Sequence, residues 1–189
     1  IRGPKDTVVR LEVLPEDEPV GGATQVIDIV RDEVKLEEQA AQSEIIEVPA
    51  DETGENTVKI GIIDLPVFYL DFNGRALNKP DYRSSTRDVR RLIGEMKAEG
   101  ISGLVIDLRN NGGGSLLEAT TLTGLFIDQG PVAQVRNSSG RVSTEEDSDP
   151  GMAWDGPLAV MVNRYSASAS EIFAAAIQDY GRGVVVGET

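Results

Sequence analysis

Two short apolar strands on either side of one amphipathic helix constrain the fold of this chain more than any other feature. Val58–Leu65 has the character of a buried strand, and Leu104–Leu108 is a second, fully apolar one. The helix between them begins at Ser84 and stops at Gly100. Its apolar side chains recur at i, i+3, i+4 and i+7: Val89, Leu92, Ile93 and Met96. Strands connected in this way run parallel, so the pattern predicts an α/β fold built from βαβ units.

The flanking segments predict further strands around this unit. Residues 7–14 and 24–30, the second run continuing towards Leu36, predict a hairpin or an edge pair. Residues 143–151 are acidic and polar and predict an exposed loop. Further strands are expected at 131–136, 157–162 and 184–186, and a further helix at 115–126.

A serine-rich stretch, Arg164–Glu171, joins an apolar strand to an Ala-rich helix. Ser168-x-x-Glu171 fits a capping box, so Ser168 or a neighbour should lie at the helix N-terminus. Backbone N–H groups and the positive end of the helix dipole favour a developing negative charge at such a position. A serine there could act as a nucleophile beside an oxyanion site. The alternative is that these serines only cap the helix.

A run of three glycines follows the strand Leu104–Leu108 directly. Gly112–Gly114 allows unusual backbone torsions and very close approach by another chain segment. Ligands of α/β sheets tend to bind at this end of the strands. The run is neither a G-x-G-x-x-G fingerprint nor a Walker loop, and a plain tight turn is the alternative reading.

Composition narrows the classes of function. The 189 residues are 40% hydrophobic, which is typical of a globular chain. A net charge of −14 argues against nucleic-acid and anionic-membrane binding. Because the chain has no histidine, it cannot contain a Ser-His-Asp triad or a His-ligated metal site. A serine nucleophile in this chain would therefore need activation by a lysine or a carboxylate.

The sequence resembles the tail-specific, or carboxyl-terminal processing, serine proteases. The resemblance covers most of residues 57–189 and rests on three blocks in the family's order: Val105–Gly114, Ser166–Ala174 and Gln178–Arg182. It implies a crotonase/ClpP-like α/β core, a Ser-Lys dyad and no cofactor or metal. It also implies cleavage of unfolded or tagged proteins that are recognised by apolar C-termini.

The same resemblance assigns roles to individual residues. Ser168 occupies the nucleophile position, and Ser166 and Ser170 are expected to be structural. The oxyanion donors would be the backbone N–H of Ala169 and that of a glycine in the Gly113–Gly114 turn. Two acidic residues should shape the site without transferring protons: Glu171 and Asp179.

The resemblance also divides the chain into segments. Residues 1–36 look like the tail of a PDZ substrate-recognition domain and the strand returning from it; PDZ domains bind peptide C-termini by strand addition. Residues 37–56 hold seven acidic and no basic residues, which predicts a solvated linker or insert. Residues 57–189 would be the first part of the protease core.

The expected catalytic lysine does not fall within the chain. It should stand in a Phe-Gly-Lys-Gly block just after the Gly-Glu-Thr motif at 187–189, where the chain ends. The lysines present are all upstream of the glycine turn, and none matches that block: Lys5, Lys35, Lys59, Lys79 and Lys97. We therefore expect a piece of a longer protease that is inactive by itself.

Partners and location follow from the resemblance alone. It suggests a periplasmic enzyme, or one on the periplasmic face of the inner membrane, with a possible lipoprotein adaptor. Exposed sheet edges could let such a piece self-associate. Two other readings remain open at this point: an acyl-CoA enzyme of crotonase type, which needs no serine nucleophile, and a non-catalytic peptide-binding fragment.

Overall fold

The computed structural model describes residues 3–32, 39–51 and 53–187. The chain forms two compact units, Ile1–Glu38 and Gln39–Thr189. The first unit contains an antiparallel pair, β1 (Val8–Val13) and β2 (Gln25–Val30), in register from Val8↔Val30 to Val13↔Gln25. This confirms the expected hairpin. The predicted continuation of its second strand to Leu36 lies partly outside the described residues, and the PDZ assignment stays a prediction.

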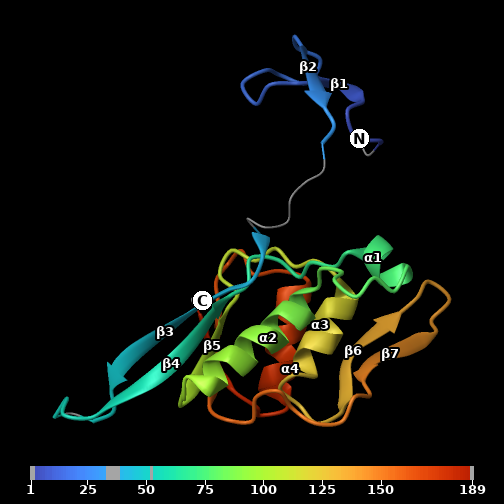
Figure 1. Cartoon of the computed structure of the whole chain (residues 1–189). Helices are drawn as coiled ribbons and strands as arrows, with labels where there is room; N and C mark the ends of the chain where they lie inside the picture. Colours follow the sequence, from blue (N-terminus) through green and yellow to red (C-terminus); the bar gives the residue numbers. More distant parts are fainter. Residues whose placement is uncertain (1–2, 33–38, 52, 188–189) are drawn as a thin grey trace. The chain divides into compact units, whose positions relative to one another are not determined.

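The second unit is organised around a five-stranded sheet in the order β3-β4-β5-β8-β9 (Figure 1). Four of its strands are mutually parallel: β4 (Thr57–Asp64), β5 (Gly103–Asp107), β8 (Leu158–Val162) and β9 (Val184–Gly187). β3 (Gln42–Pro49) pairs antiparallel with β4 at one edge. The predicted α/β class with βαβ units is confirmed; the finer comparison with a crotonase/ClpP-like core stays a prediction.

β3 lies within residues 37–56, for which the sequence predicts an acidic linker or insert without a strand. Gln42–Pro49 forms a full edge strand, with Glu44 paired to Ile62 and Glu47 to Lys59. An edge strand leaves most of its side chains in water, so acidic residues are no obstacle to its main-chain pairing. Charge count alone therefore did not distinguish this strand from a linker.

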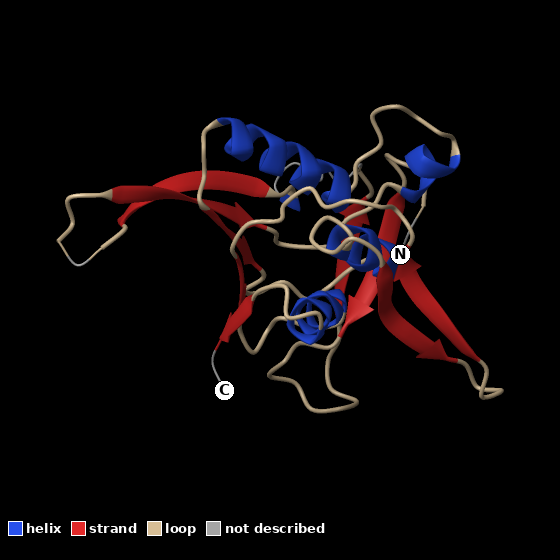
Figure 2. Cartoon of the chain, turned by 90° about the horizontal axis from the view of Figure 1, so that it is seen from below, coloured by secondary structure: helices blue, strands red, loops and turns tan. Residues whose placement is uncertain are grey.

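Three helices pack on one face of the sheet: α2 (Ser85–Ala98), α3 (Leu116–Thr123) and α4 (Ala169–Asp179) (Figure 2). Right-handed crossovers between successive neighbouring strands place the connecting helices on the same face. A short helix, α1 (Phe72–Ala76), precedes α2. Within the described ranges, no helix has the length and apolar character needed to cross a membrane.

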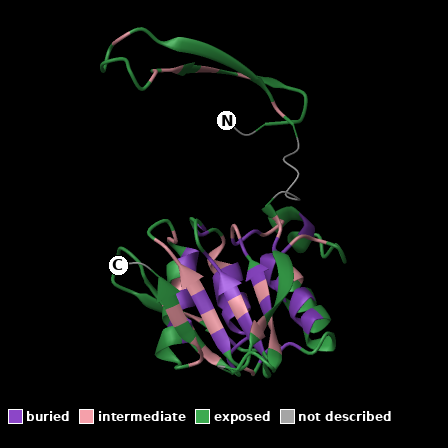
Figure 3. Ribbon diagram, turned by 90° about the vertical axis from the view of Figure 1, so that its left-hand side faces the viewer, coloured by how far each residue is buried: buried purple, intermediate pink, exposed green. Residues whose placement is uncertain are grey.

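The core lies between the sheet and these helices. One register row across β4, β5 and β8 is fully buried: Ile63, Ile106 and Val160. The preceding row, Ile62, Val105 and Ala159, is half-buried. Buried and half-buried residues therefore alternate along these strands, as their colours in Figure 3 show. Phe173 of α4 packs against Phe68 and Phe126, with ring centroids 6.3 and 5.7 Å away. The apolar stripe predicted for α2 is buried as expected.

A separate hairpin corrects the loop expected at 143–151. β6 (Gly130–Arg136) pairs antiparallel with β7 (Val142–Asp147) around the turn at 137–140. Most side chains of β7 are exposed, so its acidic composition resembles that of a loop although its main chain is paired.

Candidate active site

Ser168 lies where β8 passes into α4 and has a strained backbone. It is the N-cap of the helix, with φ 57° and ψ −113°, a conformation that residues other than glycine rarely adopt. Such strain costs about 1–3 kcal/mol and persists only where the surrounding structure enforces it. Ser168 is exposed, and it pairs with Glu171 in the capping box that the sequence predicts. The predicted position at the helix N-terminus is confirmed.

Glu171 stabilises this conformation from the first turn of α4. Its carboxylate accepts a hydrogen bond from the backbone N–H of Ser168 at 2.6 Å. A carboxylate near a helix N-terminus also interacts favourably with the helix dipole. Glu171 therefore contacts the main chain of Ser168, in line with the expected shaping role.

The hydroxyls of the two neighbouring serines donate to backbone carbonyl oxygens. Ser166 Oγ donates to the carbonyl oxygen of Leu108 at 2.7 Å. Ser170 is fully buried, and its Oγ donates to the carbonyl oxygen of Asn111 at 2.9 Å. Both hydrogen bonds tie the serine stretch to the segment that follows β5. Of the three serines, Ser168 is the exposed one.

The glycine turn packs directly against Ser168. Gly113 has φ 104°, and a Cβ built on it would lie 2.8 Å from Ser168 Cβ and 3.0 Å from Ala169 N. Gly114 has φ 141°, and a Cβ there would collide with the carbonyl oxygen of Phe68. The glycines are therefore required by close approach as well as by torsion. The structure thus brings together the predicted residues Gly113, Gly114, Ser168 and Ala169.

Gly113 packs against Ser168, and the residue that follows each of them has a backbone N–H without an acceptor. Neither Ala169 N–H nor Gly114 N–H donates to an acceptor among the described residues. The N–H of Gly113, in contrast, donates to Asn111 Oδ1 at 2.8 Å. Of the two glycines expected to supply an oxyanion donor, Gly114 is therefore the one with a free N–H.

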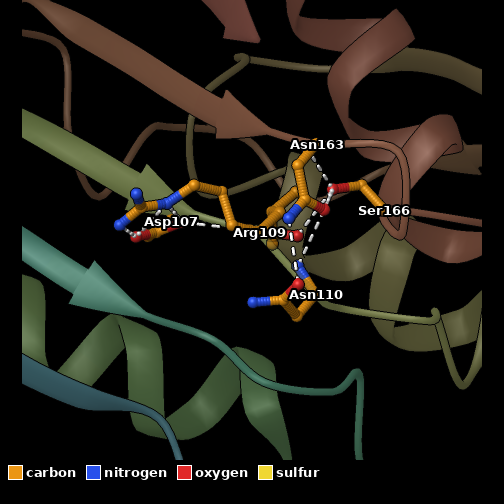
Figure 4. A network of polar contacts seen from close by, with 6 residues as sticks. Asp107, Arg109, Asn110, Asn163 and Ser166 are labelled. Atoms are coloured by element: carbon orange, nitrogen blue, oxygen red, sulfur yellow. Dashed lines mark hydrogen bonds and ion pairs between the residues drawn. The ribbon is translucent and has the colours of Figure 1, made fainter. Parts of the chain in front are cut away.

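A polar network at the carboxyl ends of β5 and β8 adjoins these loops (Figure 4). Asn110 N–H donates to Asn163 Oδ1 at 3.0 Å, and Asn163 Nδ2 donates to Asn110 Oδ1 at 2.9 Å. Asn163 N–H in turn donates to Ser166 Oγ at 2.9 Å. This side-chain pair links the segment that carries the glycine turn to the segment that carries Ser168.

An open cleft of about 510 Å³ lies over the same strand ends. Its lining residues are Asp64, Pro66, Asp107, Arg109, Asn110 and Asn163. Burial and the nearby charge of Asp107 raise the pKa of Asp64. Burial alone would also raise the pKa of Asp107, but hydrogen bonds and the charge of Arg109 outweigh it and hold that pKa below its usual value.

Asp107, Arg109 and Asn110 lie in the family block Val105–Gly114, but the sequence analysis gave them no role. It did not single out Asn163. Their position is set by the register of two strands that are far apart in the sequence, Asp107↔Met161 among the pairs. A signal was nevertheless present, because polar residues immediately after the apolar parallel strands at 104–108 and 157–162 meet at one sheet edge.

Asp179 is not brought to Ser168. It is the last residue of α4, an eleven-residue helix whose N-terminus carries Ser168. At 1.5 Å per residue the two ends of this helix are about 15 Å apart. Asp179 therefore does not contact Ser168, and the expectation that it shapes the site stays a prediction.

The described lysines make no hydrogen bond to Ser168. Lys59 Nζ donates to the carbonyl oxygen of Glu99 at 3.1 Å, and Lys97 Nζ donates to that of Ala153 at 3.1 Å. Lys97 and Glu99 lie at the C-terminal end of α2, which returns the chain to the amino end of β5. Ser168 follows the carboxyl end of β8. Lys79 is exposed in the loop after α1, and Lys35 lies outside the described residues.

Comparison with known proteins identifies the family of the chain. Residues 59–189 match the model of peptidase family S41. The chain aligns along its whole length with the tail-specific protease of Haemophilus influenzae, at 44% identity over 188 residues. The alignment covers 24% of that protease. It also aligns along its whole length with the chloroplastic carboxyl-terminal-processing peptidase 2 of Arabidopsis thaliana, at 30% identity over 189 residues. That alignment covers 32% of the peptidase.

A solved structure agrees with the sequence comparisons. The photosystem II D1 C-terminal processing protease superposes with a TM-score of 0.63 at 26% identity, over 98% of this chain and 45% of that one. The chain spans about a quarter to a third of the length of the two relatives named above. The mixed α/β fold with its central sheet is thus that of C-terminal processing proteases, and the chain belongs to peptidase family S41.

Proposed function

We propose that this chain is the part of a serine-type C-terminal processing peptidase that carries the nucleophile and the oxyanion site. The observation that supports this most is the state of Ser168. It is an exposed serine in a strained strand-to-helix turn with Gly113 packed against it. Ala169 and Gly114, the residues that follow Ser168 and Gly113, have N–H groups without an acceptor among the described residues. Nucleophilic serines of other hydrolases stand on sharp, strained turns of the same kind.

In the proposed mechanism, Ser168 Oγ attacks the scissile carbonyl carbon and a tetrahedral intermediate forms. Its negatively charged oxygen accepts hydrogen bonds from Ala169 N–H and Gly114 N–H. The N-terminus of α4 adds the positive end of its dipole. One such donor is worth about 3–4 kcal/mol of barrier in serine proteases. Glu171 holds the main chain of Ser168 in place through its 2.6 Å hydrogen bond.

The proton of Ser168 needs a base, which we assign to a lysine beyond Thr189. Such a lysine would have to be desolvated, so that it is neutral near pH 7, and within hydrogen-bond reach of Ser168 Oγ. The described lysines donate to other acceptors or are exposed, which supports this assignment. Without this lysine, the 189-residue chain alone is inactive. By the family resemblance, we also assign residues 1–36 to the end of a PDZ domain.

The proposed substrates are unfolded or tagged proteins with apolar C-termini. Support comes from the names of the relatives, which describe tail-specific and carboxyl-terminal processing proteases. A periplasmic location and a lipoprotein adaptor are part of the same proposal and rest on the family resemblance. The crotonase-type and non-catalytic readings gain no support from the comparisons.

A cleavage assay tests the proposal. The chain is extended through the block expected to hold the lysine and given an unfolded peptide with a free apolar C-terminus or its amidated twin. We expect cleavage of the free form, lost in Ser168→Ala and retained in Ser138→Ala, an exposed serine of the β6–β7 turn. Cleavage that survives Ser168→Ala would remove the serine mechanism, and equal cleavage of both peptides would remove tail recognition.

Self-association of the piece through its sheet edges is a separate part of the proposal. The outer edge of β3 has no partner strand among the described residues. An unpaired edge is a template for pairing with another chain. Light scattering should show a mass that rises with concentration, and a constant monomer mass would contradict it.

A further inference from the structure

Asn111 stands at the junction of every segment that builds the candidate site. It is fully buried, and it lies between the strand end at Asp107 and the glycine turn. Its Nδ2 donates to the carbonyl oxygen of Leu65, one residue past β4, at 2.7 Å. Its Oδ1 accepts the N–H of Gly113 at 2.8 Å. The amide side chain is therefore held from both ends.

The main chain of Asn111 reaches the serine stretch. Its carbonyl oxygen accepts the N–H of Ala167 at 3.0 Å and the Oγ of Ser170 at 2.9 Å. Ala167 and Ser170 flank Ser168 and Ala169 in the sequence. One buried residue thus joins β4, the glycine turn and the segment that leads into α4.

The bond from Gly113 N–H to Asn111 Oδ1 also decides which amide is left free. With the N–H of Gly113 engaged, the next N–H, that of Gly114, has no acceptor among the described residues. On its other side the turn is fixed by Phe68, whose N–H donates to Gly113 O at 2.9 Å and whose carbonyl accepts Ser115 N–H at 2.8 Å. The two peptide units that meet at Gly113 are therefore each held by a hydrogen bond: Asn111 Oδ1 accepts from the unit before Gly113, and Phe68 N–H donates to the unit that carries the Gly114 N–H.

We propose that Asn111 is a positioning residue that orients the Gly114 N–H, and not the Gly113 N–H, towards the oxyanion of the reaction. It touches neither substrate nor nucleophile side chain; it acts through the glycine turn. The catalytic part of this inference rests on the proposed peptidase function, whereas its structural part does not.

The structural part is tested on the 189-residue chain by amide hydrogen exchange and NMR. In Asn111→Ala, the Gly113 amide should lose its protection and shift, while amides in β5 away from the turn keep theirs. Thr123→Ala is the matched control, because Thr123 is a buried α3 residue whose Oγ1 donates to Ala119 O at 2.8 Å. Unchanged protection of Gly113 in a folded Asn111→Ala chain would overturn the assignment, whether or not the chain is a peptidase.

The catalytic part is tested by splitting kcat from KM in the extended, active chain. Misplacing a donor by about 1 Å costs on the order of 100-fold in rate. We therefore expect Asn111→Ala to lower kcat by about that factor with KM within about twofold, since the lost interaction is made in the transition state. Thr123→Ala should lower thermal stability and leave kcat unchanged. An equal loss of kcat in both variants would show a general effect of destabilisation and contradict the proposal.

Asn111→Asp is a conservative variant that should restore kcat at low pH, where its side chain is protonated. A protonated aspartic acid can donate to Leu65 O and accept from Gly113 N–H, whereas the carboxylate cannot donate. The kcat of Asn111→Asp, relative to wild type at each pH, should therefore rise as the pH falls, while the ratio for Asn111→Ala stays flat. A flat ratio for both variants would contradict the role of these hydrogen bonds. If the extended wild-type chain shows no cleavage at all, the proposed function fails and the exchange result alone decides the structural claim.

Discussion

At the scale of single residues, Ser168 shows a conflict between stability and the proposed chemistry. Its φ of 57° is unfavourable for any side chain with a Cβ. The neighbouring hydrogen bond to Glu171 and the packing of Gly113 hold it there. Strain of this kind persists at functional sites because the surrounding structure over-determines it.

The strain predicts that Ser168→Gly stabilises the chain. Relief of about 1–3 kcal/mol exceeds the extra backbone entropy that glycine gains in the unfolded state, about 0.4–1 kcal/mol. We expect a net gain of about 1 kcal/mol in the free energy of unfolding, measured by urea denaturation. Ser168→Ala is the control, because it removes the same hydroxyl and keeps the Cβ, so it should gain nothing. Equal stabilities of the two variants would refute the strain.

Asp147 is a second residue whose surroundings oppose its charge. It is buried, and its Oδ2 has no hydrogen-bond partner among the described residues. Burial raises its pKa, and the charges of Asp149 and Asp128 act in the same direction. The hydrogen bond from Asp149 N–H and the charge of Arg90 oppose them without cancelling the rise. Because the folded pKa lies above the unfolded value, the charged form destabilises the fold at neutral pH.

Asp147→Asn should therefore stabilise the protein at pH 7 by about 1 kcal/mol. The gain should shrink as the pH falls through the raised folded pKa and vanish below the ordinary aspartate value, where both states are protonated. Urea melts at several pH values measure it, with the exposed neighbour Glu146→Gln as the control. A gain that is independent of pH would contradict the electrostatic explanation.

At the scale of elements, the position of the glycine turn depends on how α2 and α3 are held together. Glu118, in the first turn of α3, is buried and accepts three hydrogen bonds at the N-terminus of α2. The donors are Ser84 Oγ at 2.8 Å, Ser85 Oγ at 2.9 Å and Thr86 N at 2.7 Å. Its carboxylate thus lies near the positive ends of two helix dipoles.

Glu118→Ala should destabilise the chain by about 3 kcal/mol or more, because it leaves three buried donors without their charged acceptor. Glu118→Gln keeps an acceptor oxygen and should lose less. Thermal melts of both variants, with exposed Glu95→Ala of α2 as the control, give the comparison. A loss for Glu118→Ala no larger than that for Glu95→Ala would show that the contact is unimportant.

The elements that the sequence predicted well are those with a strong apolar period. The α2 stripe, the buried strands and the cap at Ser168 were all visible in local patterns. β3 and β7 were missed because exposed acidic strands have the composition of loops. Asn111 was given no role and Asn163 was passed over, because their contacts join residues tens of positions apart, which no local pattern encodes.

Asp179 shows how little closeness in sequence says about distance in the fold. It lies eleven residues after Ser168, and the helix between them spans about 15 Å. In contrast, Gly113 and Ser168 are far apart in the chain and touch in the fold, because parallel strands β5 and β8 end at the same edge.

At the scale of the whole molecule, the second unit presents its chemistry at one edge of one sheet. The glycine turn follows β5, Ser168 follows β8, and the cleft of about 510 Å³ lies over the ends of β4, β5 and β8. Ligands of parallel sheets bind at this edge, so the fold and the proposed site agree.

Covalent labelling of Ser168 tests the central claim most directly. A fluorophosphonate probe reacts with activated serines, and peptide mass spectrometry locates the adduct. The extended chain should be labelled at Ser168 and not at Ser166 or Ser170, whose hydroxyls donate to backbone carbonyls. The 189-residue chain should stay unlabelled. Labelling of another serine, or of Ser168 equally in both chains, would contradict the account of a serine nucleophile activated from beyond Thr189.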